Sequence, residues 1–162
     1  MFRPLSFVRA AARGAAWSRR GAAIIGLTAV TLTIACPSAS AALNTGYTGA
    51  LSVSATTVAV GTPITVKETA TNLTGTQVPF ITVGIRRLGF NVTGVVKPRT
   101  GICRIAGSAT CSNLLLAPHE TQTYTLTLVP TARGTFQIQG WTTQPTAGGG
   151  PGVLFTVIVT VT

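Results

Sequence analysis

The residues that could carry acid, base or nucleophile chemistry are few. The sequence contains one histidine, His119, and two acidic residues, Glu68 and Glu120, and it contains no aspartate. A Ser-His-Asp triad therefore cannot form, and a version with glutamate would need Glu68 or Glu120 beside His119. The sequence has no Gly-x-Ser-x-Gly motif and no paired carboxylates of the kind that glycosidases use. This inventory predicts that the protein is not an enzyme, and the remaining catalytic hypothesis is a hydrolase that uses His119.

Metal and cofactor sites are not indicated either. Calcium sites need several oxygen ligands, usually with aspartate among them, and His119 alone cannot complete a zinc site. The glycine run 148–150 lacks the Lys-Ser/Thr pair of a phosphate-binding loop, and it precedes an expected strand rather than a helix. The sequence therefore predicts no metal and no cofactor.

Two cysteines, Cys103 and Cys111, are separated by seven residues in an expected hairpin. Facing strand positions bring Cα atoms close enough for a disulfide. The alternative is a redox or metal pair, but the spacing is not Cys-x-x-Cys. In an exported protein the pair favours a structural disulfide, which would stabilise so short a loop by about 2–3 kcal/mol.

Trp141 and His119 are the candidate ligand contacts. Trp141 shares the phase of Gln137 and Gln139 in an expected strand, so it is either a residue packed at the core or rim or an exposed aromatic that stacks on a ligand. In the second case, Trp141 and the glycine-rich loop 145–152 would form one end of a cleft. His119 lies in the turn 117–120, where a solvent-facing position is expected.

Glu68 falls on the apolar phase of the expected strand 64–72. A buried carboxylate is costly unless it is paired or hydrogen-bonded. The sequence leaves two interpretations open: Glu68 is a functional acid, or it lies near a sheet edge or meets a cation such as Arg86 or Arg87.

The first 41 residues have the pattern of a secretory signal peptide. An apolar run, 21–35, follows a basic segment, and Ala39-Ser40-Ala41 fits a signal-peptidase site with cleavage between Ala41 and Ala42. The run is shorter than the roughly 20 residues of a spanning helix. Five arginines supply the basic segment: Arg3, Arg9, Arg13, Arg19 and Arg20. The sequence therefore predicts a secreted protein, extracellular or associated with the cell wall.

The route of export stays open. Ser18-Arg19-Arg20 resembles a twin-arginine signal, although adjacent arginines also occur in ordinary signal peptides. Residues 33–36 loosely resemble a lipoprotein box that ends at Cys36, and lipidation there is the alternative to cleavage after Ala41. In either case, contact with a membrane is expected only through the signal peptide or such a lipid.

The formal net charge of +10 falls to +5 after residue 41, because seven basic and two acidic residues remain. The basic residues are scattered, with Arg86-Arg87 and the pair Lys97 and Arg99 as the near neighbours. No basic patch is interleaved with aromatics, so nucleic-acid binding is not predicted. Mild attraction to an acidic cell-wall polymer or lipid surface is one consequence, and simple solubility is the alternative.

The mature chain alternates apolar and polar residues with a period of two, as β-strands do. The pattern is clearest in 121–129 and 153–162, and turn residues recur about every ten positions. We predict a short flexible leader over 42–50 and an all-β domain over 51–162. Its expected architecture is an immunoglobulin-like antiparallel β-sandwich of about seven strands.

The segment Val60-Gly61-Thr62-Pro63-Ile64-Thr65-Val66, which closes at Thr71-Asn72, resembles the opening of bacterial extracellular Ig-like repeats of the CARDB and DUF11 kind. The second half is similar to DUF11 domains, with Cys103, then Cys111, then Leu114-Leu115-Leu116-Ala117-Pro118-His119-Glu120 and a Thr/Leu strand. The family usually has glycine at the position of His119, and the acidic stretch before the cysteines is missing here.

This resemblance implies an Ig-like fold with a cell-surface or adhesive-scaffold role, and it supplies no binding residues. We therefore expect a secreted or cell-surface structural or interaction module without catalytic activity. A cell-envelope polymer or a surface protein is the expected partner. The alternative is a carrier or inhibitor that binds a small ligand or a glycan through Trp141 and the loop 145–152. The ligand and the oligomeric state stay open.

Overall fold

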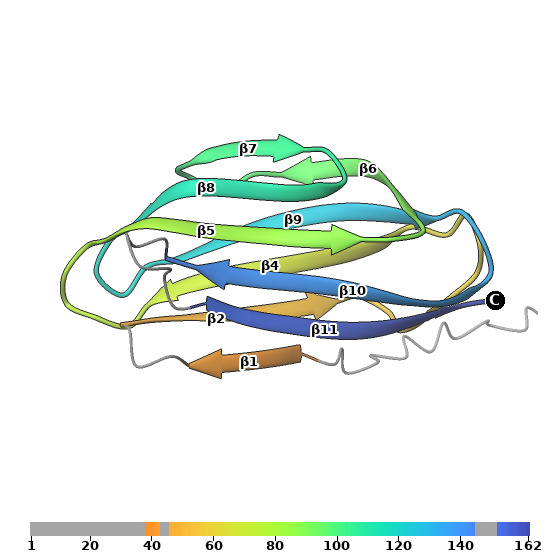
Figure 1. Ribbon diagram of the computed structural model, residues 1–162, viewed down its shortest axis with the longest axis horizontal. Helices are drawn as coiled ribbons and strands as arrows, with labels where there is room; N and C mark the ends of the chain where they lie inside the picture. The colour runs from red at the N-terminus through yellow and green to blue at the C-terminus, as the bar shows by residue number, and fades with distance from the viewer. Residues whose placement is uncertain (1–37, 43–45, 145–151) are drawn as a thin grey trace, which may run out of the picture. The chain divides into compact units, whose positions relative to one another are not determined.

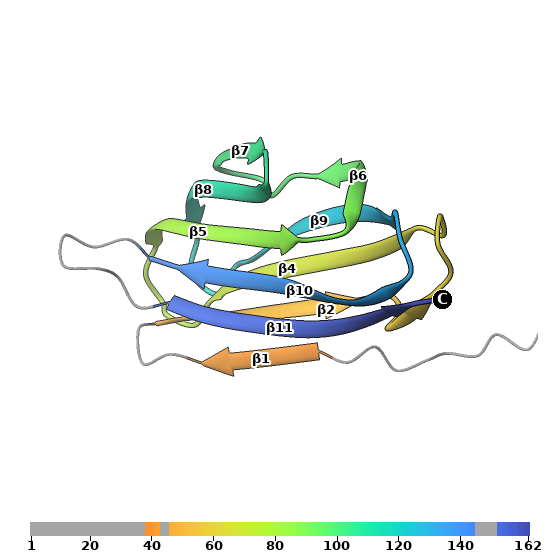
Figure 2. The ribbon, with the colours of Figure 1, turned by 45° about the vertical axis from the view of Figure 1, so that its right-hand side comes forward.

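A computed structural model describes residues 38–42, 46–144 and 152–162, which belong to one compact unit. These residues contain eleven strands and no helix. No helix long and apolar enough to cross a membrane is therefore found among them. The fold is an immunoglobulin-like β-sandwich, as the sequence predicts, and Figures 1 and 2 show its two sheets layered on each other.

The first sheet, here called sheet A, contains five strands in the order β1-β2-β4-β9-β6. All of its neighbouring strands are antiparallel. The strands are β1 (Ser38–Ala42), β2 (Tyr47–Val53), β4 (Ile64–Asn72), β9 (Thr121–Pro130) and β6 (Phe90–Val96).

The second sheet, sheet B, contains six strands in the order β3-β11-β10-β5-β8-β7. Only the short pairing of β3 with β11 is parallel among its described strands. The strands are β3 (Thr57–Val58), β11 (Gly152–Val161), β10 (Gly134–Thr143), β5 (Val78–Arg87), β8 (Ser108–Leu116) and β7 (Ile102–Ile105).

The core lies between the sheets and follows from the period of two. In β9 and β11 every second residue is buried, because successive side chains of a strand point to opposite faces. The largest fully buried apolar side chains come from both sheets: Tyr47, Tyr124, Leu51, Ile64, Ile81, Ile85, Leu114, Leu116, Leu126, Leu128 and Ile138. The alternation of apolar and polar residues in the strands is therefore enough to form a core between two sheets.

The hairpin of β7 and β8 is joined by the Cys103–Cys111 disulfide. The two cysteines are direct register partners, with their Cα atoms 4.0 Å apart. Cys111 is buried in the core and Cys103 packs against it. The disulfide holds β7, a four-residue edge strand, to the rest of sheet B.

The sequence-based boundaries are wrong at the start of the domain. Tyr47 opens β2 and is fully buried, so residues 47–50 belong to the sandwich instead of a flexible leader. The sequence pattern did not reveal the first half of this strand, because one of its buried positions is Gly49, which is not a large apolar residue. The described residues form eleven strands where about seven were expected, and three of the additional ones, β1, β3 and β7, are short strands at sheet edges.

Most of the expected signal peptide, residues 1–37 with Cys36, lies outside the described residues. The exception is the segment around the expected cleavage site. Residues Ser38–Ala42 form β1 and pair with β2 from Ser38 opposite Ser52 to Ala42 opposite Thr48. Export, cleavage after Ala41 and lipidation stay predictions.

Candidate functional site

The outer face of sheet B, which points away from sheet A, carries two transverse rows of side chains. Directly paired residues of neighbouring strands project to the same face. The first row, here the Trp row, crosses five strands: Leu154, Trp141, Gly84, Thr110 and Arg104. The second row, the Arg row, crosses four strands: Thr156, Gln139, Arg86 and Ser108.

Trp141 lies near the middle of this face, and its indole can lie over β5 because its cross-strand partner, Gly84, has no side chain. A Cβ atom added to Gly84 would lie 2.1 Å from Cζ2 and 2.3 Å from Cε2 of the indole. Any other residue would therefore push the ring off the strand. Trp141 is half-buried, so its indole rests on β5 with one side and remains partly accessible on the other.

A groove of about 660 Å³ surrounds Trp141, which is within the usual size of a ligand site. Leu154 and Leu88 contribute apolar walls and are 65% and 61% exposed. Arg86, Gln139 and Ser108 contribute hydrogen-bonding groups. The described residues that line the groove are Arg86, Leu88, Gly107, Ser108, Gln139, Trp141 and Leu154.

A second hollow of about 350 Å³ adjoins the groove on the side of β7 and β8. It shares Ser108 with the groove, and Arg104 and Thr110 of the Trp row contribute to it. The lining is Ile102, Arg104, Ala106, Ser108, Thr110, Ser112 and Asn113.

The outer face of β11 carries two apolar residues, Leu154 and Ile158, which alternate with its threonines. Both are exposed, at 65% and 46%, and no described element covers them. With the half-buried Trp141 they make this part of the outer face of sheet B apolar.

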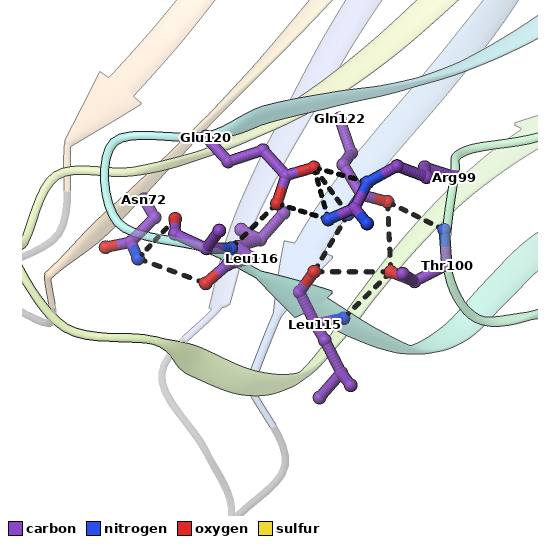
Figure 3. A network of polar contacts seen from close by, with 8 residues as sticks. Asn72, Arg99, Thr100, Leu115, Leu116, Glu120 and Gln122 are labelled. Carbon is purple, nitrogen blue, oxygen red and sulfur yellow. Dashed lines mark hydrogen bonds and ion pairs between the residues drawn. The ribbon is translucent and has the colours of Figure 1, made fainter.

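Glu120 lies at the far end of the β8–β9 turn in a network of polar contacts, shown in Figure 3. Its Oε1 accepts a 3.0 Å hydrogen bond from Nε of Arg99, and its Oε2 accepts a 2.7 Å hydrogen bond from the backbone N–H of Ala117. Nε2 of Gln122 also donates to Oε1. Partial burial would raise the pKa of Glu120, but the Ala117 and Arg99 hydrogen bonds and the Arg99 charge lower it overall.

His119 is exposed and forms no dyad with Glu120, whose carboxylate is committed to Arg99, Ala117 and Gln122. Its backbone has a φ of 58°, in the left-handed region, and its N–H donates to the carbonyl of Thr74. The position is therefore a turn position that favours glycine. The structure does not bring His119 near Trp141 in one site, since neither hollow at Trp141 or Arg104 includes it.

Replacing His119 with glycine is expected to leave the fold intact and to raise the free energy of unfolding by up to about 1 kcal/mol. The reason is that a non-glycine residue in the left-handed region costs about 1–2 kcal/mol, partly offset by the greater freedom of glycine in the unfolded chain. Urea denaturation of the His119→Gly variant beside the wild type checks this. A loss of more than 1 kcal/mol would show that the imidazole has a structural role that these contacts do not explain.

Asn72 is a buried polar residue that the sequence-based search for sites did not single out. Its Nδ2 donates to the carbonyls of Thr76, Leu116 and Ala117 at 2.6, 3.2 and 2.9 Å, and its Oδ1 accepts from the N–H and hydroxyl of Thr74. It therefore fastens the β4–β5 turn to the end of β8. The sequence feature that could have indicated this role is the position of Asn72 at the end of an alternating strand, directly before a turn.

The structure contradicts one of the two interpretations of Glu68, a position near a sheet edge or beside Arg86 or Arg87. It lies in β4, which is flanked by β2 and β9, and its side chain is fully buried instead of lying at a sheet edge. Neither Arg86 nor Arg87 meets it, because Arg86 is in the Arg row and Arg87 donates to the carbonyls of Phe90 and Ala106. Its Oε1 accepts a 2.8 Å hydrogen bond from Thr142, while Oε2 has no partner in the described residues. Burial raises the pKa of Glu68 to about 8, and the Thr142 hydrogen bond only partly opposes this.

In the described part of the chain, no three His, Cys, Asp or Glu side chains gather into a group that could hold a metal ion. The loop 145–152, expected to complete a cleft with Trp141, lies outside the described residues except for Gly152. Gly152 is not among the described residues that line the groove at Trp141.

No family model matches the chain, and no curated protein matches it. Solved structures do match in fold. The CARDB domain of the PF1109 protein from Pyrococcus furiosus, solved in complex with di-metal ions, is 16% identical, with a TM-score of 0.43 over 78% of this chain and 93% of that one. The GAE domain of GGA2p from Saccharomyces cerevisiae is 7% identical, with a TM-score of 0.48 over 76% and 97%.

A third match is AggA, the major subunit of aggregative adherence fimbriae type I from Escherichia coli, which is 13% identical, with a TM-score of 0.32 over 81% of this chain and 98% of that one. These similarities concern the arrangement of strands and carry no residue of a site across.

Proposed function

We propose that this protein is a secreted, non-catalytic interaction module that binds a cell-envelope polymer through the outer face of sheet B. The observation that supports this best is Trp141, held on Gly84 by the sheet and bordered by exposed Leu154. A rigid aromatic in a groove with a few hydrogen-bonding groups is a common design for ligand recognition.

The distribution of ionisable residues supports the non-catalytic part. Glu68 is buried and Glu120 is committed to a turn, so neither described carboxylate faces the groove. His119 also lies outside the groove lining. The proposal of an extracellular location is supported by the disulfide, which persists in oxidising compartments, and by the signal-like pattern of residues 1–41.

The test is co-sedimentation of the full chain with a protease-treated, insoluble envelope fraction, so that only polymers remain as partners. We expect the wild type to sediment with the polymer, and Trp141→Ala to bind at least tenfold more weakly. Gly84→Ala should weaken binding similarly, because the new Cβ displaces the indole. Gly75→Ala is the matched control, since a Cβ at Gly75 meets no atom within 4 Å.

Thermal unfolding of each variant establishes that it is folded, and Trp141→Phe gives a milder change if Trp141→Ala is unstable. Equal binding by the wild type and by folded variants with the indole removed or displaced would contradict the proposed surface. Failure of the wild type to bind any envelope polymer would contradict the function itself.

A further inference from the structure

We infer that the ligand of the outer face of sheet B is an acidic polysaccharide, a chain of sugar rings that carries carboxylate groups, laid across the strands along the Trp row. This inference rests on the proposed function and specifies its ligand. It depends on the charge of the face, on the free hydrogen-bonding groups and on the shape of the two adjoining hollows.

The face carries positive charge without any negative charge. Arg86 lines the groove and Arg104 lines the second hollow, and both are exposed. Neither guanidinium makes a hydrogen bond or ion pair with the described residues, in contrast to Arg99, which is paired with Glu120, and Arg87, which donates to two carbonyls. Glu68 is buried and Glu120 is paired, so neither of the two acidic side chains in the sequence competes for Arg86 or Arg104. An anionic partner complements such a face.

The groups beside the two arginines suit a sugar chain. Gln139 and Ser108 have side chains that both donate and accept hydrogen bonds, and Thr110 adds a third in the second hollow. None of these three side chains is hydrogen-bonded within the described part of the protein. A hydroxyl-rich ligand uses such groups, and the apolar face of a sugar ring packs on an indole. A purely apolar ligand would leave them unpaired, at a cost in affinity.

The shape favours a polymer over a single sugar. The groove and the second hollow share Ser108 and together reach from β11 to β7. Five strands at about 4.8 Å spacing make a path of roughly 19 Å, longer than one sugar ring. Along this path Trp141 on β10 lies two strands from Thr110 on β8, and Arg104 follows on β7. One chain could therefore stack on Trp141 and place a later carboxylate at Arg104.

Charge alone does not account for the arrangement, because Lys67, Lys97 and Arg133 are exposed elsewhere without an aromatic neighbour in a groove. An acidic protein segment is the competing partner. It would use the arginines but would not need the indole as a stacking surface for a ring. An experiment can therefore distinguish the two partners by asking whether binding requires the Trp141 indole and whether it requires sugar rings in the ligand.

The experiment measures binding of the full chain to four defined polymers by affinity electrophoresis or calorimetry. Polygalacturonate and hyaluronate are acidic polysaccharides, methyl-esterified polygalacturonate has the same sugar backbone without the charge, and poly-L-glutamate has the charge without sugars. We expect at least one acidic polysaccharide to bind at least tenfold more tightly than both the esterified polymer and poly-L-glutamate.

The variants assign the preference to residues. The double variant Arg86→Gln with Arg104→Gln should reduce the preference for the acidic over the esterified polymer to within about twofold. Trp141→Ala should weaken binding to both polysaccharides, and Arg133→Gln, on the turn before β10, should change neither. Equal binding of acidic and esterified polymer, or of poly-L-glutamate, would overturn the inference. The first of these outcomes would leave the proposed polymer-binding function standing, whereas no binding by any polysaccharide in either assay would remove both.

Discussion

Raising the pH from about 4.5 to about 9 is expected to lower the free energy of unfolding of the wild-type domain by up to about 5 kcal/mol through Glu68 alone. Burial raises the pKa of the folded Glu68 from its ordinary value of 4.5 to about 8. Below pH 4.5 Glu68 is protonated in both states, and its contribution to stability is fully present. Between pH 4.5 and 8 the unfolded chain loses the proton while the folded chain keeps it, so stability falls, and above pH 8 the loss is complete.

The groups that surround Glu68 make this effect large. Tyr124 is its register partner on β9 and has a raised pKa, mainly because it is buried, and its hydroxyl has no partner in the described residues. On sheet B, Thr142 donates to Oε1, and a Cβ on Gly140 would lie 2.2 Å from Oε2. No described cation pairs with the carboxylate, so ionisation inside the core is not compensated.

Urea denaturation at closely spaced pH values measures the effect, with Glu68→Gln as the near-isosteric variant that cannot ionise. The Glu68→Gln curve should be nearly flat between pH 5 and 8. The same series in a His119→Gly background, which lacks the single histidine of the sequence, is the second comparison. A wild-type curve that stays parallel to that of Glu68→Gln would show that Glu68 ionises without cost.

Replacing Asn72 with alanine is expected to lower the free energy of unfolding by about 3 kcal/mol or more, and the midpoint of thermal unfolding by about 10 °C. The change would remove the partner of three carbonyls and of the N–H of Thr74 at once. The bond to Leu116 is buried, so water cannot fully replace the lost amide there.

Asn91→Ala is the matched control, because Asn91 is an exposed asparagine of β6 without a side-chain hydrogen bond in the described residues. It should change stability by less than about 0.5 kcal/mol. Thermal unfolding followed by circular dichroism compares the two variants with the wild type. Similar midpoints for Asn72→Ala and Asn91→Ala would mean that the turn relaxes to satisfy its carbonyls without Asn72.

The sequence predicted best those strands in which apolar and polar residues strictly alternate and one face is exposed to solvent. Residues 121–129 and 153–162 correspond to β9 (Thr121–Pro130) and β11 (Gly152–Val161). Alternation specifies which residues face the core, and this also placed Glu68 and Trp141 on their correct sides. Short strands such as β3 and β7 lack enough residues for a period to be visible.

The candidate site could be predicted only in part. The phase of Trp141 put it on the face of Gln139, but nothing local indicated that Gly84 lies beneath it or that Arg86, Arg104 and Ser108 share that face. Those relations depend on strand order, which brings β10 beside β5 and β5 beside β8 across long stretches of chain. The strand order also places Glu68 in sheet A and Arg86 in sheet B, which their separation in the sequence did not indicate.

The most direct test of the proposed binding face is a titration of the isotope-labelled full chain with an oligogalacturonate, followed by NMR chemical shifts. The largest shifts should fall on the backbone amides of Gly84, Arg86 and Gln139 and on the indole N–H of Trp141, with smaller shifts toward Arg104. The amides of Asn72 and Glu120, in the polar network of Figure 3, should stay in place. Shifts confined to that network, or spread over the exposed cations without the Trp141 indole, would contradict the account.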